Sequence, residues 1–102
     1  MVPLSPNTIR RMEIMFEPND RATARMLLEQ HCADNLPFCE TSDMFALERL
    51  RFAVLKLAAG RLERLACEVE QAKSDWRDTL MAAGFGEDVN AHERWFPSPR
   101  TG

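Results

Sequence analysis

The sequence lacks the long apolar run that a membrane-spanning helix requires. In its helical part the longest stretch without a charged residue is 79–86, far short of the roughly 20 residues that cross a bilayer. The N-terminus also lacks a continuous apolar segment followed by a small-residue cleavage site. We therefore expect neither contact with a membrane nor a secretion signal.

Cysteine is scarce, and the common catalytic motifs are missing. Three cysteines are present, an odd number without the spacing of a disulfide framework, which fits a reducing cytoplasm. The chain has no C-x-x-C pair, no H-E-x-x-H helix, no nucleophile elbow and no glycine-rich phosphate loop. We predict a cytoplasmic protein that is not an enzyme and uses no cofactor.

Neither sign of charge dominates the chain. Lysine and arginine total 13, aspartate and glutamate total 16, and the isoelectric point is about 5.4. A nucleic-acid-binding domain usually carries a basic face, and an anionic membrane attracts a basic one. The balance therefore disfavours both as partners.

What the chain does have is one segment with more apolar surface than a single neighbour can cover. Residues 42–59 repeat apolar side chains at helical spacing, and a second stripe of Phe45, Phe52 and Leu55 lies on another side. A helix that is apolar nearly all round is normally central to a bundle or covered by a partner chain. The first apolar side consists of Ala46, Leu47, Leu50, Ala53, Val54, Leu57 and Ala58.

The segments before this helix are also expected to be helical. Ser5 before Pro6 resembles an N-cap followed by a residue suited to the first turn. Residues 7–16 place apolar side chains on one helical side, although they also alternate as a strand would; we predict a helix. A second helix over 21–33 ends before Pro37, because the residue before a proline is pushed out of helical angles.

After Gly60, residues 61–83 carry one apolar stripe with a charged back. Ser74 could begin a separate helix, but the unbroken stripe favours one continuous helix. Gly84 is expected to stop it in a left-handed conformation, with Phe85 packing back on the last turn. A short helix over 87–96 follows.

The predicted fold is all-α, a compact bundle of four to five helices. The central apolar helix 42–59 would lie antiparallel to the amphipathic helix 61–83 across the turn at Gly60. Residues 1–96 would form a single domain. Pro97 and Pro99 end it, which leaves 97–102 as a disordered tail.

Protein–protein association is the function that the pattern favours most. The second stripe of helix 42–59 needs a cover, and symmetric homodimers are the commonest soluble oligomers. We expect a non-enzymatic interaction module that binds itself, as a homodimer, or another protein. The competing explanation is that the terminal segments of the same chain cover the stripe. The interaction residues predicted on this side are Phe45, Arg49, Phe52 and Lys56.

Two other functions remain open. A nucleic-acid regulator of the helix-turn-helix type would use the arginines of the N-terminal third, although nearby acids cancel their charge. A thiol or metal protein would use Cys32, Cys39 and His31, although adjacent positions on a helix diverge by about 100° and no metal site is predicted. The third cysteine, Cys67, falls on a polar helical side. The arginines in question are Arg10, Arg11, Arg21 and Arg25.

Three strings of the sequence resemble small bacterial proteins of unassigned function. They are DNLPFCE at 34–40, ERLRFAVLKLAAG at 48–60 and DWRDTLMAAGFGEDVNAHERW at 75–95. The resemblance implies a free-standing bacterial cytosolic protein. It implies no activity, cofactor or functional residue.

Overall fold

The computed structural model describes residues 3–32, 44–88 and 90–97, and this part of the chain is all-α without strands. The prediction of an all-α fold is confirmed, with six helices in the described residues rather than four to five. They are α1 (Pro6–Met15), α2 (Pro18–His31), α3 (Met44–Ala58), α4 (Leu62–Ser74), α5 (Trp76–Ala83) and α6 (Ala91–Arg94).

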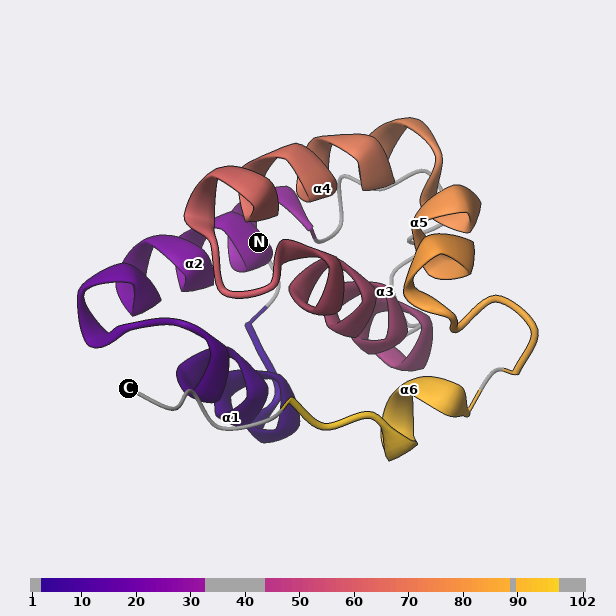
Figure 1. Cartoon of the computed structure of the whole chain (residues 1–102), viewed down its shortest axis with the longest axis horizontal. Helices are drawn as coiled ribbons and strands as arrows, with labels where there is room; N and C mark the ends of the chain where they lie inside the picture. Colours follow the sequence, from indigo (N-terminus) through magenta and orange to yellow (C-terminus); the bar gives the residue numbers. More distant parts are fainter. Residues whose placement is uncertain (1–2, 33–43, 89, 98–102) are drawn as a thin grey trace.

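Helix α3 lies in the middle of the molecule. It packs against α1, α4, α5 and α6, whereas α2 packs against α1 and α4. Figure 1 shows α4 and α5 along one side of α3, and α1 and α6 along the other. Both apolar sides of α3 are therefore in contact with helices of the same chain. Residues that could begin this helix, Thr41 and Ser42, lie outside the described residues.

The N-terminal helix forms as expected, which excludes the strand alternative for 7–16. The Ser5 side chain caps α1 by accepting a hydrogen bond from the Thr8 amide at 3.2 Å. Met12 and Phe16 lie in the core with 3% and 1% of their surface exposed. At the other end of α1, the Arg21 guanidinium donates to the Phe16 and Glu13 carbonyl oxygens at 3.2 and 2.8 Å.

The prediction of one unbroken helix over 61–83 is wrong, because the chain breaks at Asp75. This residue ends α4 and caps α5, with extended φ and ψ of −153° and 85°. Its carboxylate accepts a hydrogen bond from the Asp78 amide at 3.2 Å, which favours a helix start at this point. Two helices therefore replace the single antiparallel partner. The apolar stripe continues across the break because both helices pack on α3.

The end of α5 follows the prediction, but the final helix is shorter than 87–96. Gly84 adopts φ +82°, and the Phe85 amide donates to the Leu80 carbonyl at 2.9 Å, which closes the turn. Phe85 is 2% exposed. Of the described residues after it, only Ala91–Arg94 are helical. Pro97, placed in the tail by sequence, is buried, and residues 98–102 lie outside the described part.

Arg51 is buried on α3, although its charge suggested a surface position. It is 2% exposed, and its Nε and Nη2 atoms donate to the Cys32 and Leu28 carbonyls at 2.9 and 3.3 Å. Its Nη1 donates to the Pro3 carbonyl at 3.0 Å. The last carbonyls of a helix have no partners within it. Arg51 donates to two carbonyls at the end of α2. It thereby joins α2 to α3 and to the residues that precede α1.

None of the described helices combines the length and the apolar character needed to cross a bilayer.

Replacing Arg51 should destabilise the fold strongly. The Arg51→Met variant keeps an apolar stem but removes two buried hydrogen bonds from a charged donor, those to the Cys32 and Leu28 carbonyl oxygens, each worth about 1–3 kcal/mol. We expect the free energy of unfolding in urea to fall by about 3–5 kcal/mol. Arg64 is the matched control because 55% of its side chain is exposed; Arg64→Met should change stability by less than about 0.5 kcal/mol. A loss below about 1 kcal/mol for Arg51→Met would contradict this role.

Candidate interaction site

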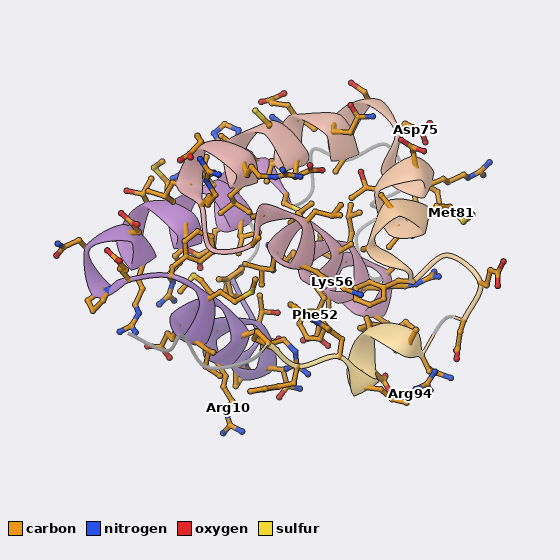
Figure 2. The ribbon with its side chains drawn as sticks, in the orientation of Figure 1. Arg10, Phe52, Lys56, Asp75, Met81 and Arg94 are labelled. Atoms are coloured by element: carbon orange, nitrogen blue, oxygen red, sulfur yellow. The ribbon has the colours of Figure 1, made fainter. Side chains whose placement is uncertain are left out.

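The four residues predicted on the second side of α3 lie together but differ in accessibility. Phe45 is 43% exposed, whereas Phe52 is 1% exposed and belongs to the core. Arg49 is half-buried and Lys56 is exposed. Figure 2 shows Phe52 and Lys56 in the middle of the molecule, whereas Arg10 and Arg94 point away from it at the edge. Phe52 is therefore not available on the surface of this fold, and the sequence-based expectation for it is corrected.

The cover over Phe52 comes from the same chain. The His92 and Trp95 rings lie 5.4 and 6.1 Å from the Phe52 ring, centroid to centroid, and the Arg11 guanidinium lies 4.2 Å above its face. Leu55, the other inner member of the stripe, is also completely buried. The alternative that the terminal segments cover this stripe thus holds for Phe52.

His92 links the exposed and the buried ends of the stripe. It is completely buried, and its ring lies 5.0 Å from Phe45 and 6.3 Å from Phe85. The angles between the rings, 76° and 65°, are those of edge-to-face contacts. His92 is therefore a core residue of this fold.

Arg49 and Lys56 bind backbone carbonyls at the end of α5. Lys56 Nζ donates to the Ala83 carbonyl at 2.8 Å and lies 5.0 Å from the centre of the Phe85 ring. The Arg49 guanidinium donates to the Phe85 carbonyl. The C-terminal end of a helix carries partial negative charge, so cations are favourable there. These two predicted interaction residues therefore already interact, but within the chain.

Arg11 is the residue at this site that sequence reasoning misassigned. It is 7% exposed, and its Nε and Nη2 both donate to the Trp95 carbonyl at 3.1 and 3.0 Å. Its guanidinium also stacks between Phe52 and Phe96, the latter at 4.9 Å. Burial lowers the pKa of Arg11, and the nearby Glu48 carboxylate opposes that shift. The available signal was its place on the face of α1 that also carries buried Thr8.

A row of side chains thus runs across α3 from one exposed phenylalanine to another. We call it the aromatic row; its two ends, Phe45 and Phe96, are 43% and 48% exposed, and every inner member is buried or partly buried. In order, the aromatic row consists of Phe45, His92, Phe52, Arg11 and Phe96.

A small cavity lies beside Phe45 and Leu47. It has a volume of about 180 Å³ and is also lined by Ser5, Thr8, Glu48 and Arg51. The Ser5 hydroxyl donates to the Glu48 carboxylate and lies 3.0 Å from the Thr8 hydroxyl. Glu48 already occupies the position that an anion would take at the start of α1, near two buried arginines. This cluster therefore balances charge inside the fold.

The arginines considered for nucleic-acid binding do not form one basic face. Arg11 and Arg21 bind carbonyls of their own chain, and Arg25 pairs with Glu29 at 3.4 Å. Binding to nucleic acid depends on lysine and arginine side chains that are free to contact its phosphates. Arg10 points away from the molecule in Figure 2. With the other three arginines engaged within the chain, the helix-turn-helix alternative has little support.

The thiol and imidazole candidates are not gathered in the part of the chain that the structure describes. Cys32 is buried at the end of α2 and Cys67 is exposed on α4, while Cys39 lies outside the described residues. His31 Nδ1 lies 3.3 Å from Lys73 Nζ. Within the described ranges, no three His, Cys, Asp or Glu side chains are close enough to hold a metal ion.

Arg11 should hold the C-terminal residues against α1 and α3. In the Arg11→Met variant, the Trp95 carbonyl loses two charge-assisted hydrogen bonds, so amide hydrogen exchange at residues 91–95 should accelerate at least roughly tenfold. The amides of α4 should keep their protection. The control is Arg10→Met, a change of the exposed neighbouring arginine, which should leave exchange unaltered. Equal exchange in both variants would contradict the role of Arg11.

Asp88 offers a test of the turn before α6. The Arg94 guanidinium and the Asn90 amide both donate to the Asp88 carboxylate and hold its pKa below the ordinary range. Because the folded-state pKa is depressed, this stabilisation is present above the unfolded-state value of about 3.9 and is lost as pH falls through the folded-state pKa. In an NMR titration, Arg94→Gln should raise the Asp88 pKa. An unchanged value would show that Arg94 does not make this contact in solution.

Comparison with known proteins adds no relative to this geometry. The chain matches no family model, and the searches of curated proteins and of solved structures give no match. The resemblance to small bacterial proteins therefore stays a prediction, and the function rests on the site itself.

Proposed function

We propose that the protein is a non-enzymatic interaction module that associates with a second copy of itself. The observation that carries the proposal is the pair Phe45 and Phe96, two half-exposed phenylalanines at the ends of one aromatic row. A cytoplasmic location and the absence of a cofactor belong to the same proposal.

The hydrogen bonds made by the basic side chains around the aromatic row support the proposal. Arg11, Arg49 and Lys56 donate to backbone carbonyls of their own chain. Arg11 thereby holds the residue next to Phe96 against α1, while Arg49 and Lys56 hold the end of α5 beside the row. Large rings held in one conformation bury area at little entropic cost, which is why aromatic residues are frequent at the centres of interfaces.

A second copy is the occupant that this arrangement favours. An isologous contact places the same patch on both subunits, so Phe45 of one copy can pack on Phe96 of the other, and the reverse contact forms at once. The same contact then occurs twice in each dimer, whereas an unrelated partner would have to supply a separate contact for each ring. A wild-type chain that stays monomeric in the experiment below would leave a protein partner of other sequence as the alternative occupant.

Sedimentation velocity over a range of protein concentrations tests the proposal. We expect a reversible dimer, and the double variant Phe45→Ser/Phe96→Ser should raise its Kd roughly 100-fold or more, since burying the exposed half of each ring contributes about 1 kcal/mol and each occurs twice. The matched control is Met26→Ser/Met81→Ser, which removes side chains that are 42% and 59% exposed on α2 and α5.

The control variant should dimerise like the wild type. A wild-type protein that is monomeric at every concentration contradicts self-association. Equal weakening in both double variants would place the interface away from the aromatic row.

A further inference from the structure

We propose that the two copies hold each other by exchanging their C-terminal segments, residues 91–97. Each segment would dock on the α1 and α3 face of the other chain, in the position that it occupies on its own chain in the structure. The inference rests on the proposed self-association and names the contact that produces it. Figure 1 shows this segment passing from α6 along the edge of the molecule to α1.

The exchanged segment makes its principal contacts with elements far away in the sequence. Its His92 ring packs on Phe45 and Phe52 of α3, and its Trp95 carbonyl binds Arg11 of α1. Among the described helices, α6 packs mainly on α3. The receiving face presents rings and a guanidinium to this segment, and it presents the same groups to an identical segment from another chain.

The connection to the rest of the chain is exposed. Gly86, Glu87, Asp88 and Asn90 all lie on the surface, whereas His92 and Pro97 on the far side of the connection are buried. Among the described helices, none follows α6 in the chain. Straightening the connection breaks the described contacts of the Asp88 carboxylate with the Asn90 amide and the Arg94 guanidinium. Exposed ion pairs of this kind contribute little to stability.

The length of the connection sets how the copies would lie. Residues 86–90 can span roughly 17 Å when extended, so the donor and receiving chains must be side by side. Phe45 and Phe96 lie at the two ends of the docked segment and therefore border the second chain. Each chain's own tethered segment competes for its face at an effective concentration in the millimolar range. The contacts of Phe45 and Phe96 with the second chain are what allow exchange at a lower protein concentration.

Complementation between two defective variants tests the exchange. Arg11→Glu damages the receiving face, because its carboxylate faces the Trp95 carbonyl, and leaves the segment intact. Trp95→Asp damages the segment, because it removes the Trp95 ring that packs on Phe52 and Phe85. It leaves the receiving face intact. In an exchanged heterodimer, the segment of the first variant docks on the face of the second, which restores one complete contact.

The two variants are unfolded in urea and refolded separately and as an equimolar mixture, and each sample is examined by sedimentation velocity. We expect monomers for each variant alone and a dimer in the mixture, at a concentration at which the wild type is dimeric. Circular dichroism confirms that each variant keeps its helices; if either does not, the milder pair Arg11→Met and Trp95→Ala is used with the same readout.

The possible failures are distinguishable. A monomeric mixture beside a dimeric wild type overturns the exchange and leaves self-association standing. Dimers of either variant alone, at the wild-type Kd, also overturn the exchange. A wild type that stays monomeric throughout overturns both proposals.

Discussion

The fold depends on basic side chains that bind backbone carbonyls at the ends of short helices. Every helix leaves its last carbonyls without partners, and a chain made of short helices has many such ends in little space. Arg21 serves the end of α1, Arg51 the end of α2 and Lys56 the end of α5. A hydrogen bond from a charged donor contributes about 1.5–3 kcal/mol. These contacts hold helices in place that are too short to be stable alone.

This use of charge changes how the surface is understood. A chain with many arginines suggests a partner with phosphates, but the arginines that the sequence singled out mostly serve the chain itself. Arg11 shows this most clearly, because it binds the Trp95 carbonyl and stacks between two phenylalanines. The side chains of the aromatic row that stay accessible are the phenylalanines at its two ends. The proposed association follows from this division between cations used inside and rings left outside.

Local rules of helix chemistry gave reliable predictions where one residue decides the outcome. Ser5 caps α1, and Gly84 ends α5 with Phe85 folded back, because a side-chain oxygen or a missing Cβ acts on neighbouring backbone groups. The break at Asp75 follows the same rule, yet the apolar stripe concealed it. A stripe records which side faces the core, and two helices that pack on α3 produce the same stripe as one.

The candidate site was only partly within reach of the sequence. Phe45, Arg49, Phe52 and Lys56 were correctly grouped on one side of α3 by the period of the helix. Their partners lie at the end of α5 and in the C-terminal segment, between 27 residues (Lys56 and Ala83) and 47 residues (Phe45 and His92) away in the chain, and no local pattern links them. The buried state of Arg51 was likewise invisible, because its acceptors are carbonyls that every residue has.

The sequence by itself determined the helical class, most helix ends and the surplus of apolar surface on α3, since these depend on residue type and spacing. The tertiary structure alone decided what covers that surplus. Phe52 is enclosed because α1 and α6 meet over it, and Phe45 stays half-exposed because the cover ends at His92. Burial is a property of how distant segments meet, so it cannot be read from the period of any one of them.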